Sequence, residues 1–272
     1  MVLDEEKAKF THPFSIMKTT KTSKFIILFL LLCTFQYGFG QYAASRMQRA
    51  ADRVSTAFET KEALLKKEFS EKHLVWPAKY LYIRSFKFDA QLEVWVKNDL
   101  KEDFRLFKTY RVCMASGTMG PKRMEGDFQV PEGFYYINEL NPRSLYHLAL
   151  GLNYPNTSDK ILSDAQRPGA GIYIHGSCVS VGCIPVTDAE IEELYVLASY
   201  AREEGQDFVP VHVFPIRFDN KKSVDYLKQL YKDNPEMIKF SAQLEKAFNE
   251  FQNTHRLPVI LTDPKGNYVL GS

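Results

Sequence analysis

The segment Ile172-Tyr-Ile-His-Gly-Ser-Cys-Val-Ser-Val-Gly-Cys183 is the most informative stretch of this sequence. It begins as a short apolar strand that ends at His175. Two glycines, two serines and two cysteines follow within eight residues, a composition typical of a tight loop. The segment therefore predicts a strand that leads a histidine into a loop that contains thiols.

A cysteine and a histidine in this segment are candidates for nucleophilic catalysis. A thiol with a pKa of about 8.5 is only a few per cent ionised at neutral pH, so a cysteine nucleophile needs a base. His175 could take the proton of Cys183 if the loop folds back on itself. Gly182 would let the backbone turn tightly, so that nearby amides face a developing oxyanion. Ser180 could brace the loop or orient the imidazole.

The same residues leave simpler interpretations open. His175 could be a packed or hydrogen-bonded core residue, and Cys178 and Cys183 could form a disulfide. These three side chains could also be zinc ligands, although the spacing offers no fourth ligand. We therefore predict neither a metal nor a cofactor.

Two sets of motifs resemble the L,D-transpeptidase (YkuD-type) catalytic domain family, in particular its YafK-like branch. One is the His-Gly-(six residues)-Cys signature that ends in Ser-x-Gly-Cys. The other is the upstream pair Gly120-Pro-Lys-Arg-Met-Glu-Gly-Asp127 and Val130-Pro-Glu-Gly-Phe-Tyr-Tyr-Ile137. Val181 stands where the usual Ser-His-Gly-Cys pattern has a second histidine, and this departure fits the YafK-like branch. The similarity covers about residues 79–218.

The resemblance implies an α+β fold with a β-sandwich-like catalytic domain, and an exported enzyme that acts on peptidoglycan stem peptides. Cys183 matches the family nucleophile and His175 its general acid/base, while Gly176, Ser180 and Gly182 match the surrounding signature. In this chemistry the thiol attacks the carbonyl that joins the third residue of the stem, a diamino acid, to a terminal D-alanine.

The outcome of that chemistry is left open by the resemblance. An amine that attacks the thioester gives L,D-transpeptidation. Water gives an L,D-carboxypeptidase or endopeptidase, or an enzyme that releases protein attached to the cell wall. A further alternative is a non-catalytic protein that binds the cell wall and keeps the fold. The oligomeric state is not indicated by the sequence.

Two basic residues in the upstream motif are candidates for substrate binding. Lys122 and Arg123 lie in a loop rich in glycine and proline, and either could hold a carboxylate of the stem peptide. The alternative is that both are solvated loop charges.

Local patterns predict the order of the elements. The expected N-terminal helix has apolar residues at helical spacing, and several strands follow it. Thr187-Asp-Ala-Glu190 is a capping box, and Asn234-Pro235 is a second helix start. The predicted organisation is an amphipathic helical segment at 41–76, a catalytic domain at 77–219, and C-terminal helices with a hairpin at 220–272.

Residues 1–40 resemble a cleaved secretory signal. An apolar run at 25–35, too short to span a bilayer, follows three lysines and precedes Gly38-Phe-Gly40. We expect Met17 to be the start and cleavage to follow Gly40, with a retained membrane segment as the alternative. The expected location is the periplasm or cell envelope, with membrane contact only through this segment if it is uncleaved.

Charge and cysteine content bound the function further. The 272 residues include 35 basic and 33 acidic side chains, and residues beyond 40 carry 30 of each. A neutral body predicts no nucleic-acid partner, since such binding requires many cationic contacts. Loss of the signal leaves three cysteines, so at least one thiol stays unpaired. Cys113 is expected to be a buried apolar side chain, with a bond to Cys178 left open.

Overall fold

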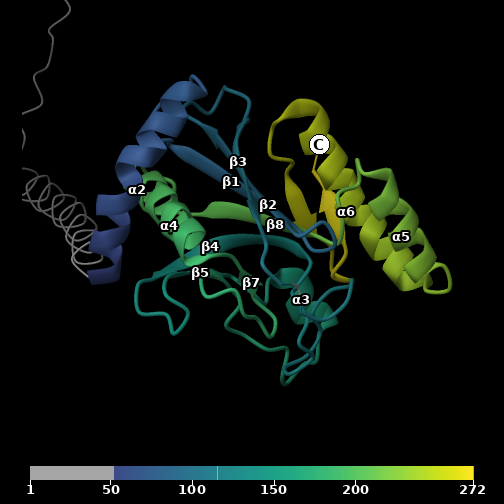
Figure 1. Cartoon of the computed structure of the whole chain (residues 1–272). Coiled ribbons are helices and arrows are strands. Elements are labelled where there is room, and N and C mark those ends of the chain that lie inside the picture. The colour runs from purple at the N-terminus through teal and green to yellow at the C-terminus, as the bar shows by residue number, and fades with distance from the viewer. Residues whose placement is uncertain (1–51, 115, 272) are drawn as a thin grey trace, which may run out of the picture. The chain divides into compact units, whose positions relative to one another are not determined.

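The computed structural model describes residues 52–114 and 116–271, so the predicted signal at 1–40 and the start of the first helix lie outside them (Figure 1). No helix in the described part is both long and apolar enough to cross a membrane. The described helices are α2 (Asp52–Glu71), α3 (Thr157–Leu162), α4 (Asp188–Glu203), α5 (Lys221–Tyr231) and α6 (Pro235–Thr254). The described strands are β1 (Tyr80–Phe86), β2 (Gln91–Lys97), β3 (Arg105–Arg111), β4 (Gly133–Asn141), β5 (Ala149–Leu152), β6 (Tyr173–His175), β7 (Ile184–Pro185), β8 (Val209–Phe214), β9 (Ile260–Thr262) and β10 (Tyr268–Leu270).

One mixed sheet forms the centre of the molecule. Its eight strands lie in the order β3-β2-β1-β8-β4-β5-β6-β7, and β9 and β10 pair separately as the predicted hairpin. The pairs β1–β8 and β6–β7 are parallel, and the other pairs in the sheet are antiparallel. The predicted α+β class is therefore confirmed.

Helices cover both faces of the sheet, with α2 and α4 on one side and α5 and α6 on the other (Figure 1). Alternate residues of a strand point to opposite faces. On β1, Leu81 and Ile83 belong to the large core that also contains residues of α2 and α4. Tyr82 and Phe86 point the other way and pack in smaller clusters with residues of α6. Strand β1 is therefore buried on both faces, and its charged residue, Arg84, is paired with Glu93 of β2 over 2.7 Å.

The chain that follows β3 connects the two edge strands of the sheet. The backbone N–H of Cys113 donates to the carbonyl of Pro185 in β7 over 2.9 Å. Cys113 also forms a disulfide with Cys178, so it is not the unbonded apolar side chain expected from the sequence. The open question about Cys113 is thus answered, and the alternative bond between Cys178 and Cys183 is excluded in this structure.

Local helix signals correspond to the structure more closely than the strand boundaries do. Thr187 caps α4 through the predicted capping box, and Asn234 caps α6 with Pro235 in its first turn. The apolar stretch that follows Tyr146 forms a strand only from Ala149, because His147 has a positive φ of 69°. Helix α3 was not predicted, although Asn156 and Asp159 form a capping box at its start.

Candidate active site

The two candidate catalytic residues, His175 and Cys183, lie at the paired ends of β6 and β7. Ile174 and Ile184 are partners in this parallel pair, so Tyr173 and Cys183 precede them at the same level. Residues at one level of parallel strands point to the same face, and residues two apart along a strand also share a face. His175 and Cys183 therefore lie on the same face of the sheet, opposite the α4 core that holds Ile174.

His175 is held in one tautomer by its own turn. Its side chain is 2% exposed, and Nδ1 lies 2.6 Å from the carbonyl oxygen of Gly176. A carbonyl only accepts hydrogen bonds, so Nδ1 carries the proton and Nε2 has the lone pair. The Tyr146 ring stacks on the imidazole with 4.6 Å between ring centres. The Gly176 carbonyl thus orients the imidazole, a role for which the sequence offered Ser180 as a candidate.

Cys183 is the free cysteine among the described residues, and its side chain is partly buried. Its Sγ lies 3.6 Å from the carbonyl oxygen of Gly171. Burial raises the pKa of the thiol, while the backbone N–H of Tyr173 and the charge of Lys122 oppose this rise. Burial also lowers the pKa of His175, against the opposing effect of the Gly176 carbonyl. These shifts favour a neutral thiol beside a neutral imidazole rather than an ion pair.

Ser180 braces the loop around Cys183. Its Oγ accepts hydrogen bonds from the backbone N–H groups of Cys183, over 2.8 Å, and Gly182, over 3.2 Å. The hydroxyl in turn donates to the Cys183 carbonyl over 2.7 Å. Of the two roles considered for Ser180, the structure thus contains the brace. The amides expected to face an oxyanion are occupied by this hydroxyl in the present structure.

The shape of the loop depends on two glycines and on the start of α4. Gly182 has a φ of +131°, a backbone conformation that residues other than glycine rarely adopt. A Cβ on Gly176 would lie 2.4 Å from Oδ1 of Asp188, which accepts a hydrogen bond from the Ser177 backbone over 2.7 Å. Asp188 was not singled out in the sequence. Its position next to the Thr187 cap could have identified it, because polar side chains near helix starts often bind nearby amides.

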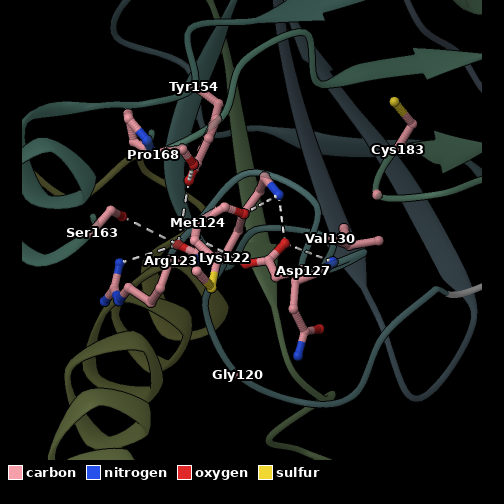
Figure 2. A network of polar contacts seen from close by, with 12 residues as sticks. Gly120, Lys122, Arg123, Met124, Asp127, Val130, Tyr154, Ser163, Pro168 and Cys183 are labelled. Atoms are coloured by element: carbon pink, nitrogen blue, oxygen red, sulfur yellow. Dashed lines mark hydrogen bonds and ion pairs between the residues drawn. The ribbon is translucent and has the colours of Figure 1, made fainter. Parts of the chain in front are cut away.

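Lys122 and Arg123 belong to a loop network that uses their charges internally (Figure 2). The Lys122 ammonium is 2.5 Å from Asp127 Oδ1 and donates to the Met124 carbonyl over 2.8 Å. Arg123 pairs with Asp159 over 3.2 Å. Because the network already neutralises both cations, the structure gives no support to their predicted role as free binding groups for a stem carboxylate.

Helix α2 supports the turn that carries Tyr146. Nη1 of Arg53 donates to the carbonyls of Ser144, over 2.7 Å, and His147, over 2.8 Å, on either side of that tyrosine. Nε2 of His147 is 2.8 Å from Glu192 of α4. Neither Tyr146 nor Arg53 was predicted to belong to the site. Tyr146 contacts His175 across 29 residues of chain, and Arg53 contacts His147 across 94. Local sequence patterns do not report contacts at such separations.

A cavity of about 680 Å³ lies along β4 on the sheet face that carries the candidate pair. Its lining includes Tyr136 and Asn138 of β4, Asn153 after β5, and Tyr268 of the hairpin. The Asn138 side chain also borders Gly151 in β5, where a Cβ would be 2.9 Å from Oδ1. The cavity therefore begins beside the strands that position His175.

No metal site fits the candidate zinc ligands, because the Cys178 sulfur is bonded to Cys113. In residues 52–114 and 116–271, no group of three His, Cys, Asp or Glu side chains is arranged to hold a metal ion. The remaining candidates are a free thiol and a histidine at one end of the sheet.

Comparisons with known proteins place these residues in a family. Residues 89–213 match the family model of the L,D-transpeptidase catalytic domain, YkuD. The chain is 33% identical over 192 residues to a protein of Escherichia coli K12 that is provisionally named L,D-transpeptidase YafK, and the match covers 70% of this chain and 73% of the relative.

Similar solved structures include two bacterial proteins. The helical cell shape determining protein Pgp2 from Campylobacter jejuni is 21% identical with a TM-score of 0.39, covering 73% of this chain and 80% of that one. Bd1075 from Bdellovibrio bacteriovorus is 25% identical with a TM-score of 0.37, covering 64% and 63%. On the family match and the 33% identity to YafK, the chain belongs to the L,D-transpeptidase (YkuD) catalytic domain family.

Proposed function

We propose that this chain is an exported cysteine acyltransferase of peptidoglycan stem peptides, with Cys183 as the nucleophile and His175 as the general acid/base. One observation carries the proposal. The free thiol and the imidazole share a sheet face at the paired ends of β6 and β7, and the Nδ1 proton of the imidazole is held by Gly176. The lone pair of Nε2 is thus left to accept a proton.

In the first step, Nε2 of His175 takes the proton of the Cys183 thiol as Sγ attacks the carbonyl carbon of the diamino acid. A carbon–sulfur bond forms, and the negative charge moves to the carbonyl oxygen. The bond from this carbon to the nitrogen of D-alanine then breaks. His175 gives its proton to that nitrogen, so free D-alanine leaves and a neutral thioester remains.

The amides of Gly182 and Cys183 are candidate donors for the oxyanion, and both are bound to Ser180 in the resting state. An oxyanion would have to replace the Ser180 hydroxyl as their acceptor. Ser180 would then act as a placeholder that keeps both N–H groups aligned before the substrate binds. Such donors are typically worth roughly 3–4 kcal/mol in the transition state.

In the second step, an amine or a water molecule attacks the thioester carbon. His175 removes the proton of the incoming group, the carbon–sulfur bond breaks, and the proton returns to Sγ. An amine gives a new peptide bond, which is transpeptidation, while water gives a free carboxylate. Both outcomes use the same acyl-enzyme.

Two features support action outside the cytoplasm. Residues 1–40 have the pattern of a secretory signal, and a disulfide joins Cys113 to Cys178. Disulfides form and persist mainly in oxidising compartments such as the periplasm.

The test is acylation of Cys183, followed by identification of products. Mature protein treated with a carbapenem should gain the mass of one acyl group, and a Cys183→Ala variant should gain none. Incubation with disaccharide-tetrapeptide should release D-alanine and give either a cross-linked dimer or a tripeptide. Unmodified Cys183 together with unchanged muropeptide would reject catalysis and favour the alternative of a cell-wall-binding protein.

A further inference from the structure

A row of residues crosses the end of the sheet and leads to the candidate nucleophile. Glu139 of β4 is paired with Gly151 of β5, and Gly151 is paired with Tyr173 of β6. Tyr173 is level with Cys183 at the start of β7. Paired residues in a sheet share a face, so the side chains of Glu139, Tyr173 and Cys183 all lie on one face.

The missing side chain of Gly151 lets its neighbours meet. A Cβ at this position would be 3.1 Å from both the Tyr173 ring and the Glu139 Cβ. The Tyr173 hydroxyl donates to Oε2 of Glu139 over 3.3 Å. Burial raises the pKa of Tyr173, and the Glu139 carboxylate and the ionised form of Cys183 add to the rise. The phenol therefore lies close enough to sense both the carboxylate and the thiol.

The Glu139 carboxylate is exposed and has no cation of its own. Among the described residues, no lysine, arginine or histidine nitrogen forms an ion pair with it. Two other carboxylates differ in this respect, since Asp127 pairs with Lys122 and Asp159 with Arg123. A negative charge fixed by a tyrosine and left without a counter-ion is suited to bind a cationic group of a ligand.

The geometry points to Glu139 and Tyr173 as the subsite for the distal ammonium group of the diamino acid in the acyl donor. This assignment rests on the function proposed above. Glu139 and Tyr173 meet over β5, two strand spacings from β7, which is about 10 Å. In an extended diamino acid the distal nitrogen lies about 7–8 Å from the carbonyl carbon, six bonds away. With the carbonyl at Cys183, the remaining gap of about 2–3 Å is the length of one hydrogen bond between the ammonium and the Glu139 carboxylate.

The consequence is a donor specificity based on charge. A free distal ammonium gains a charge-assisted hydrogen bond from Glu139, and an acetylated or absent amine does not. Because Tyr173 holds the carboxylate, it acts as a positioning residue for this contact. The subsite would thus select stem peptides with an unmodified diamino acid for acylation of Cys183.

The experiment compares two donors that differ only at that amine. Tetrapeptide stems with the distal amine free or acetylated are mixed with the mature protein, and D-alanine released in the first turnover is measured. This readout reports acylation and does not depend on whether an amine or water resolves the thioester. In the wild type, kcat/KM for acylation of Cys183 should be about tenfold higher with the free-amine donor than with the acetylated one. Glu139→Gln should lose this preference by slowing only with the free amine, and Tyr173→Phe should lose part of it.

The control is Glu125→Gln, which removes another exposed carboxylate, one that pairs with Arg167. It should keep the wild-type preference. Equal rates for both donors in the wild type, or an equal loss on both donors in Glu139→Gln, would overturn the assignment while leaving the acyltransferase intact. If the wild type releases no D-alanine from either donor, the proposed function itself fails, and the subsite with it.

Discussion

The two buried histidines of the sheet, His175 at its β6–β7 end and His212 in central β8, lie in contrasting surroundings. His212 is enclosed by rings, with Nδ1 2.6 Å from the Tyr82 hydroxyl and the Phe134 ring at 4.7 Å. Burial and the nearby Arg84 charge lower the pKa of His212 to about 3. His175 is also buried, but its Nδ1 donates to a carbonyl that favours the protonated ring.

Burial alone therefore does not distinguish a structural histidine from one that can transfer a proton. Both side chains are at most 5% exposed. What distinguishes them is the partner atom at Nδ1. A carbonyl stabilises the imidazolium that forms during proton transfer, whereas a hydroxyl beside an arginine does not. The contacts of His212 in the core agree with a structural role.

The largest expected effect comes from replacing each histidine by glutamine. His175→Gln removes the proposed base, so kcat/KM for D-alanine release should fall by about 10²–10⁴-fold. Its urea midpoint should change little by comparison. His212→Gln should keep the activity of the folded protein but lower its free energy of unfolding by about 1–3 kcal/mol, since a buried polar contact is disturbed. A loss of stability in His175→Gln together with a loss of activity in folded His212→Gln would contradict the roles assigned to the two histidines.

Acid should destabilise the protein through His212. Its folded pKa of about 3 lies below the ordinary value of 6.5, so the unfolded state binds more protons between these two pH values. The stability that neutral His212 contributes is therefore complete above pH 6.5 and is lost as pH falls towards 3. Between pH 7 and 4 the loss should be about 3 kcal/mol. Urea unfolding of the wild type and His212→Gln measures it, and equal losses in both would contradict the assignment.

Removal of the disulfide should affect the β6–β7 end more than the centre. A Cys113→Ala/Cys178→Ala variant should lose about 2–4 kcal/mol of unfolding free energy. Hydrogen exchange should increase more in residues 176–183 than in β8. Thiol titration of the unfolded mature protein should give one thiol for the wild type and three after reduction. Uniform exchange changes across the sheet would argue against a local role of the bond.

The decline of kcat/KM at low pH, the acid limb of the profile, should begin below the usual pKa range of histidine. His175 must be neutral to accept the thiol proton, and burial lowers its pKa. Activity should therefore persist as pH falls through 6.5 and decline only below it, with about a tenfold loss per pH unit on the limb. A profile of kcat/KM against pH measures this limb. An acid limb above pH 6.5 would indicate that another group controls the step or that a thiolate–imidazolium pair forms.

The smallest effect is expected for Tyr146→Leu. This change removes the ring that stacks on His175, and such stacking is worth about 0.5–1.5 kcal/mol. We expect a two- to tenfold loss of kcat/KM with little change in KM. Tyr226→Leu is the matched control, because Tyr226 is equally exposed and stacks on Phe88. A similar loss in both variants would show that the Tyr146 contact has no special role.

Local sequence signals predicted the parts of the fold that depend on neighbouring residues. The cap at Thr187 and the C-terminal hairpin follow from patterns within about ten residues. The contacts of Tyr146 and Asp188 around the loop depend on how distant elements pack, and a single sequence does not report such packing. The bond between Cys113 and Cys178 spans 65 residues, so the sequence could state only that it was possible.

The position of that bond in the chain bears on how the protein is made. On the proposed export, cysteines leave the channel in sequence order, and Cys113 and Cys178 are the first two beyond residue 40 to emerge. An oxidase that joins consecutive cysteines would form the bond seen here, between the first two of these three cysteines. By that route the native pairing forms without isomerisation, and Cys183, the thiol proposed for chemistry, is the cysteine left unpaired.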